Sequence, residues 1–92
     1  MSSKKPADYC RTERLKARGR LAALARARDA DDPDVVTARR KLAAIKARGL
    51  LLAALDELTE ATNPDAPDLE LPLSLCREAA DEVGRQLQAA AG

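Results

Sequence analysis

One stretch, residues 32–62, limits what this chain can fold into more than any other. Asp32 is a favourable N-cap residue, and Pro33 suits the first helical position, where the backbone needs no N–H donor. No further proline follows until residue 64. The pattern therefore predicts one continuous helix over 32–62, about 45 Å long at 1.5 Å per residue. A chain of 92 residues cannot enclose such a helix, so the helix has to offer its apolar side to other helices along its length.

The apolar residues of this helix recur at alternating spacings of three and four, which places them on one face. After Ile45 the leucines and alanines of residues 50–58 cover most of the helix circumference, so this part is predicted to be the centre of the core or of an interface. The narrower stripe consists of Val35, Ala38, Leu42, Ile45, Gly49 and Leu52.

Two further helices are expected on either side of the long one. Residues 6–30 are predicted to be helical, with Pro6 in the first turn, and the short acidic turn that follows makes this helix an antiparallel neighbour of 32–62. Residues 63–73 hold three prolines and three acidic residues, which predicts an extended linker. Ser74 is the expected N-cap of a last helix over 74–91, where Gly84 reads as a packing position. Its apolar stripe is Cys76, Ala80, Val83, Leu87 and Ala90.

These elements predict one all-α domain over residues 1–92: a long antiparallel helical hairpin with a third, C-terminal helix packed on it. The core has to be thin, because the chain has no Phe or Trp and one Tyr, and its most frequent apolar residue is alanine. A chain of this kind needs a protein partner or a second copy to cover its apolar surface, so we expect a homo-oligomer or a coiled-coil-like partner complex. The residues expected at the interface are Leu42, Ile45, Leu51, Leu52, Leu55, Leu58, Val83 and Leu87.

The charges are distributed unevenly along the chain. Residues 1–50 carry 14 basic and 6 acidic side chains, a net charge of +8, whereas residues 51–92 carry 2 basic and 9 acidic ones, a net charge of −7. Two interpretations follow: the halves attract each other, within one molecule or between copies, or the basic half binds a polyanion. In the first, the acidic residues of 78–82 lie near Lys41, Lys46 or Arg48. In the second, nucleic acid is bound by Arg11, Arg14, Lys16, Arg18, Arg20, Arg26, Arg39, Arg40 and Lys41.

The residue types that support catalysis are scarce. The chain has no His to activate a nucleophile or bind a metal, and no Gly-rich loop to bind phosphates, so we expect no enzyme activity, metal, cofactor or small-molecule substrate. Cys10 and Cys76 are interpreted as small apolar packing residues, with a disulfide between them as the less favoured alternative. The longest apolar run, 49–55, is too short to span a membrane, and no apolar segment follows Lys5 as in a signal peptide. A cytoplasmic protein that does not bind membranes is therefore expected.

The run RLAALARARDADDPDVVTARRKLAAIKA, residues 20–47, resembles a segment of small helical proteins of actinobacteria and their phages or prophages. The resemblance rests mainly on ADDPDVVTARRKLAA. It implies a bacterial or phage setting and a non-enzymatic accessory role, and it brings no catalytic or binding residues. Together with the composition, it favours an adaptor or regulator that acts by protein–protein interaction and self-associates. The alternative is a nucleic-acid-binding regulator that uses the basic N-terminal half.

Overall fold

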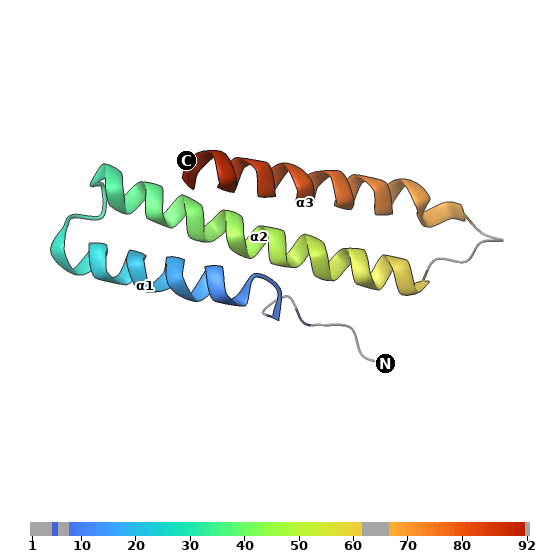
Figure 1. Cartoon of the computed structure of the whole chain (residues 1–92), viewed down its shortest axis with the longest axis horizontal. Coiled ribbons are helices and arrows are strands. Elements are labelled where there is room, and N and C mark those ends of the chain that lie inside the picture. Colours follow the sequence, from blue (N-terminus) through green and yellow to red (C-terminus); the bar gives the residue numbers. More distant parts are fainter. Residues whose placement is uncertain (1–4, 6–7, 62–66, 92) are drawn as a thin grey trace.

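The protein is all-helical. The computed structural model describes residue 5 and residues 8–61 and 67–91, in which three α-helices and one short 3-10 helix are found and no strand (Figure 1). The helices are α1 (Arg11–Ala27), α2 (Pro33–Ala61) and α3 (Glu70–Ala91), and the 3-10 helix η2 (Pro67–Leu69) precedes α3. The all-α fold class expected from the sequence is thus confirmed.

The start of α2 shows how the sequence specifies the turn between α1 and α2. The Asp32 side chain caps α2, since its Oδ1 accepts a hydrogen bond from the backbone N–H of Asp34 at 2.9 Å. The guanidinium of Arg28, just after α1, forms ion pairs with the carboxylates of both Asp32 and Asp34. These carboxylates raise the pKa of Arg28, mainly through the hydrogen bond with Asp32. The predicted N-cap and helix start are therefore confirmed.

The start of α1 differs from the prediction. Instead of a helix from Pro6, α1 begins at Arg11, because Cys10 has a left-handed backbone conformation with φ 53° that an α-helix cannot include. A turn before it is closed by the Asp8 backbone N–H, which donates to the Lys5 carbonyl O at 2.9 Å. At the other end, α1 stops at Ala27, three residues before the predicted boundary.

The start of α3 also differs, because helix replaces most of the predicted linker. Residues 63–66 lie outside the described part of the chain, but α3 begins at Glu70, so Ser74 is an internal residue of the helix and not its N-cap. Pro72 is the third residue of α3. Proline is tolerated there because the first N–H groups of a helix have no intrahelical acceptor. The three prolines of this segment therefore do not all exclude a helix.

The core lies along one side of α2. The predicted stripe is buried from Val35, which is fully enclosed, to Gly49, but at its end Ala53 is buried and Leu52 only half-buried. Ala80 is the buried residue of α3, and Cys76, Val83 and Leu87 are half-buried; the Ala90 side chain lies outside the described part. All three α-helices meet in a cluster formed by Ala17, Leu21, Leu42, Ile45 and Leu87, with Cys10 beside it.

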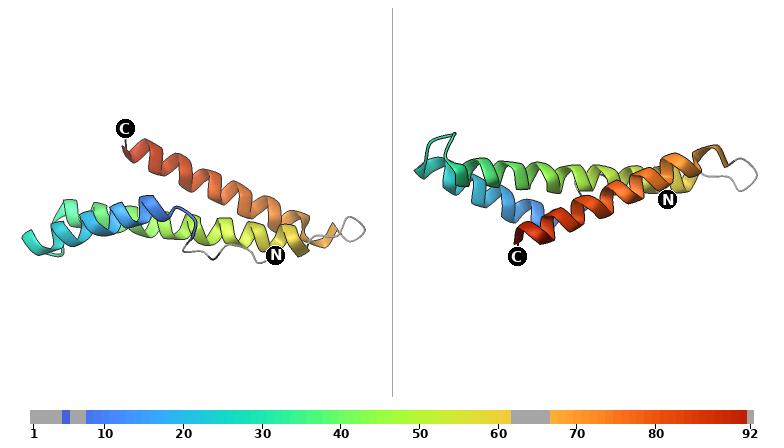
Figure 2. Two further views of the ribbon diagram at one scale, coloured as in Figure 1. Left: turned by 60° about the horizontal axis from the view of Figure 1, so that its bottom comes forward. Right: turned by 90° about the horizontal axis from the view of Figure 1, so that it is seen from above.

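The arrangement of the helices is asymmetric. The central helix α2 packs against both α1 and α3, and it runs antiparallel to each of them (Figure 1). In Figure 1 α2 lies between α1 and α3, and Figure 2 shows that α1 and the C-terminal part of α3 are both displaced toward one side of α2, with the C-terminal end of α3 standing away from the other two helices. Because α1 has 17 residues and α2 has 29, α1 lies beside only the N-terminal part of α2. This geometry leaves a hollow between α1 and α3 and an open side on α2.

Candidate interaction site

One hollow of the molecule is a groove between α1 and α3, with α2 as its floor. Its volume is about 340 Å³, and side chains of all three helices line it. The apolar part of the lining comes mostly from Ala17, Ala38, Ile45 and Leu87. Two of these four are alanines, one in α1 and one in α2. Their short side chains leave space that leucines would fill. We call this hollow the α1–α3 groove.

Basic side chains of α1 and α2 line the α1–α3 groove, whereas α3 contributes Leu87 and the neutral Gln88. Lys16 and Arg20, one turn apart on α1, form one edge, and Lys41 of α2 lies on the same groove. Glu13 is the acidic residue of the lining, against four basic ones when Arg48 is included. The groove therefore combines an apolar floor with a mainly positive rim, which favours an apolar ligand that carries negative charge.

A second hollow continues the groove toward the N-terminal end of α2. The two hollows share Arg20, Ala38, Lys41 and Leu87, so they form one continuous depression. The second hollow has a volume of about 640 Å³. It adds the basic Arg40, the acidic Asp34 and three uncharged residues, Thr37, Ala44 and Gln86. The combined depression follows α2 over residues 34–48, about four helical turns.

Arg48 closes the other end of the groove and joins the three helices. Its Nε donates a hydrogen bond to the carbonyl O of Ala80 in α3 at 3.3 Å, and its Nη1 donates to Sγ of Cys10 before α1 at 3.4 Å. The guanidinium is part-buried and lies next to Gly84, the packing position expected in the last helix. From the sequence, Arg48 was expected only to pair with an acidic side chain. The sequence signal for its role in joining the helices was the glycine in α3.

The residues predicted for an interface serve mainly to pack the helices of one chain. Leu42 and Ile45 are buried in the three-helix cluster, and Leu87 packs against it and lines the groove. The remaining predicted interface residues are half-buried, so part of each stays accessible: Leu51, Leu52, Leu55, Leu58 and Val83. The most exposed large apolar side chains are instead Leu71 at 68%, Leu50 at 58% and Leu75 at 54%.

The residues predicted for nucleic-acid binding do not form one surface. Eight of the nine are exposed, and Arg14 is half-buried. Because successive helix residues point about 100° apart, the run of Arg39, Arg40 and Lys41 points in three directions. Lys16, Arg20 and Lys41 meet at the α1–α3 groove, whereas Arg11, Arg18, Arg26 and Arg39 line neither hollow. The structure thus brings together a subset of the predicted residues and separates the rest.

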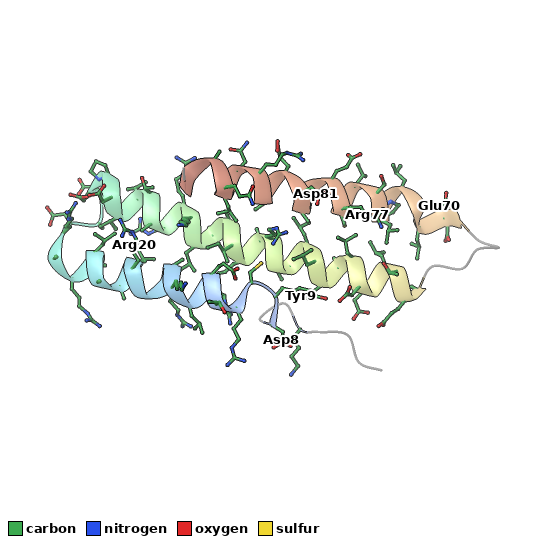
Figure 3. All side chains as sticks on the ribbon, viewed as in Figure 1. Asp8, Tyr9, Arg20, Glu70, Arg77 and Asp81 are labelled. Atoms are coloured by element: carbon green, nitrogen blue, oxygen red, sulfur yellow. The ribbon has the colours of Figure 1, made fainter. Side chains whose placement is uncertain are left out.

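The predicted charge pairing between the halves takes a different form. Glu82 forms an ion pair with Arg85 of its own helix at 3.2 Å, and Arg48 contacts a backbone carbonyl of α3 instead of a carboxylate. Asp81 and Arg77, labelled in Figure 3, are both exposed on α3. The basic residues of the groove therefore remain accessible to an external acidic group.

Two further features concern chemistry and membranes. Within residues 8–61 and 67–91, no group of three or more His, Cys, Asp and Glu side chains is placed to hold a metal ion. Cys10 and Cys76 are both free thiols, half-buried, so the structure shows no disulfide between them. None of the described helices combines the length and hydropathy of a membrane span.

Comparison of the chain with protein-family models, curated protein sequences and solved structures finds no match in any of the three.

Proposed function

We propose that this chain is a non-enzymatic interaction protein, an adaptor or regulator, which binds an acidic amphipathic helix of a partner protein in the α1–α3 groove. The observation that carries the proposal is the apolar floor of this groove between Lys16, Arg20 and Lys41. A helix laid along the groove would have two flanking helices and α2 beneath it, which is the arrangement of a four-helix bundle. Leucines spaced three or four apart would enter the hollow, as in other helix-in-groove complexes.

The charge of the rim determines the chemistry of the partner. Acidic residues beside the leucines of the bound helix would lie against the positive edges of the groove. Such rim charges mainly set specificity and association rate, whereas the apolar contacts supply most of the affinity. The partner helix is therefore expected to carry Glu or Asp beside its apolar stripe, above all on the side that faces α1.

Fluorescence anisotropy with two designed helical peptides tests this proposal. Both carry the same leucine pattern, and one has glutamates where the other has lysines on the flanks. We expect the acidic peptide to bind and the lysine peptide not to bind. Lys41→Glu should weaken binding of the acidic peptide about tenfold, a cost of about 1.4 kcal/mol. Arg18→Glu, a matched charge reversal on α1 outside the groove, should change it less than twofold. Equal binding of both peptides, or equal effects of both substitutions, would contradict the proposal.

A second candidate function is nucleic-acid binding by the basic half of the chain. It is favoured by the exposure of Arg11, Lys16, Arg18, Arg20 and Arg26 on a single helix. Binding through phosphate contacts would fall steeply with salt, because each neutralised phosphate releases counterion. A gel-shift titration of duplex DNA and RNA at low salt tests this function, and no retardation at micromolar protein would exclude it.

Self-association is the remaining part of the proposed function. Its support is the exposed apolar surface, including Leu50, Leu71 and Leu75, on a chain whose buried core is thin. The α1–α3 groove and the self-association surface need not coincide, since α2 also has an open side away from the groove.

A further inference from the structure

The open side of α2 carries an apolar face that runs the length of the helix. At 3.6 residues per turn, eight apolar residues lie within an arc of about 100° on this side. Four of them are large and four are alanines, and the charged residue within the arc is Arg40, near one edge. The face comprises Val36, Ala43, Ala47, Leu50, Leu51, Ala54, Leu58 and Ala61. We call it the outer face of α2.

Five of the eight residues of the outer face are exposed, and Leu51, Ala54 and Leu58 are half-buried. Leu50 is 58% exposed and Val36 36% exposed, and Ala43, Ala47 and Ala61 are exposed as well. The outer face points away from the buried residues of α2, and Figure 2 shows α1 and the C-terminal part of α3 displaced toward one side of α2. The chain is small and its buried core is thin, so an apolar face of this length needs a partner that covers it.

We propose that a second copy of the chain covers the outer face, with the two α2 helices antiparallel. This inference rests on the self-association included in the proposed function, and it assigns the surface and the register. Six face residues, 36, 43, 47, 50, 54 and 61, are separated by 7, 4, 3, 4 and 7 positions, a series that reads the same in both directions. A two-fold axis between residues 47 and 50 therefore places Leu50 against the partner subunit's Ala47. The same axis places Val36 against the partner subunit's Ala61, so that in both of these pairs a large side chain meets a small one.

The charges at one edge of the outer face fit the same register. Arg39 and Glu57 are 18 residues apart, which is five full turns, so they lie at the same edge of the face. The two-fold axis of an antiparallel pair is perpendicular to both helices, so this edge of one α2 lies next to the same edge of the other. Arg39 then lies within one residue of the level of Glu57 of the partner subunit, and the symmetry forms this pair twice. Parallel packing would instead bring Arg39 beside the partner subunit's Arg40, a like-charge contact that disfavours the parallel dimer.

Sedimentation equilibrium of the full chain, over a range of protein concentrations, tests the surface. We expect a monomer–dimer equilibrium for the unmodified chain. Leu50→Glu should give a monomer of unchanged helicity, because Leu50 is already largely exposed. Leu15→Glu is the matched control, since Leu15 is 50% exposed on α1, away from the outer face, and this variant should still dimerise. A wild type that remains monomeric at high concentration, or dimerisation unaffected by Leu50→Glu, would overturn the proposal.

Charge reversal tests the register. Arg39→Glu and Glu57→Arg should each weaken the dimer about 2- to 30-fold, and the double variant should restore the affinity to within about twofold. A stronger dimer after Arg39→Glu would indicate parallel packing and would overturn the antiparallel arrangement. The α2 residues that line the α1–α3 groove are Ala38, Lys41, Ile45 and Arg48, none of which belongs to the outer face, so the acidic peptide should bind Leu50→Glu as it binds the wild type. Peptide binding without dimerisation therefore contradicts this inference alone, and dimerisation without peptide binding contradicts the groove proposal alone.

Discussion

Gly84 of α3 leaves the space that the Arg48 guanidinium of α2 occupies. A Cβ atom at residue 84 would stand 3.2 Å from Arg48 Nε, closer than ordinary van der Waals contact. The same Nε donates a hydrogen bond to the Ala80 carbonyl O, one turn earlier in α3. A glycine in the interior of α3 costs helix propensity, so here the close approach of α2 and α3 offsets that cost.

Gly84→Leu should lower the free energy of unfolding by about 1–3 kcal/mol, because the new side chain has to displace Arg48 or push α3 away from α2. Gly19→Leu is the matched control, since no atom lies within 4 Å of a Cβ built at that exposed position in α1. This control should raise the free energy of unfolding by up to about 1 kcal/mol through helix propensity. Urea unfolding followed by circular dichroism measures both changes. Equal effects of the two substitutions would contradict the packing role of Gly84.

Replacing Arg48 by methionine should lower the free energy of unfolding by about 1–3 kcal/mol. The variant keeps the apolar stem but removes the charged donor to the Ala80 carbonyl O and to Cys10 Sγ, so the hydrogen bonds that tie α2 to α3 and to the segment before α1 are lost. Lys46→Met, at an exposed position of the same helix, should change stability by less than about 0.5 kcal/mol. The same denaturant titration compares the two variants. An Arg48→Met variant with an unchanged free energy of unfolding would show that the guanidinium does not join the helices.

Asp32→Ala should cost about 0.5–2 kcal/mol, because it removes the N-cap of α2. Asp32→Asn retains an acceptor oxygen for the Asp34 N–H and should cost less than Asp32→Ala. Asp31→Ala, at an exposed position of the same turn, serves as the control. Thermal unfolding monitored by circular dichroism ranks the three variants, and equal losses for Asp31→Ala and Asp32→Ala would contradict the capping role.

The ion pairs of Arg28 should make the same contribution to stability between pH 7 and pH 10. The pKa of Arg28 is raised by hydrogen bonds with Asp32 and then Asp34, and a raised pKa stabilises the fold at every pH below the arginine pKa of the unfolded chain. This contribution is lost only as the pH rises through the raised pKa, in strongly alkaline solution. The stability difference between wild type and Arg28→Gln should therefore stay constant from pH 7 to pH 10 in urea titrations. A difference that shrinks across this range would contradict the assignment.

Local sequence signals gave reliable predictions where one interaction determines the structure. Asp32 specifies the start of α2 by capping it, and Pro33 fits the first turn because no backbone N–H is needed there. The three–four spacing from Val35 to Gly49 specifies the buried side of α2. The start of α3 was not predictable from proline content alone, because Pro72 fits a first turn as well as a linker. The first helix was predicted too long because a left-handed conformation at a cysteine, as at Cys10, has no signal in the sequence.

The candidate site was harder to predict, because it depends on how helices far apart in the sequence diverge. Lys16, Arg20 and Lys41 were correctly singled out as accessible basic residues, but their convergence on one groove follows from the angle between α1 and α3. The apolar floor contains alanines, and a short apolar side chain in a sequence can indicate close packing or a hollow. Arg48 illustrates the same limit, since its partners, Ala80 and Cys10, contribute a backbone carbonyl and a thiol and not a charge.

The three α-helices meet only around Leu42 and Ile45, in the cluster that also contains Ala17, Leu21 and Leu87. Beyond this cluster each end of the molecule is a pair of helices, α1 with α2 at one end and α2 with α3 at the other. Two helices bury less apolar surface than three, so each end can open at lower free energy than the whole fold. Backbone amides near residues 42–49 should therefore exchange their hydrogens most slowly, and the two ends of α2 should exchange faster and independently of each other.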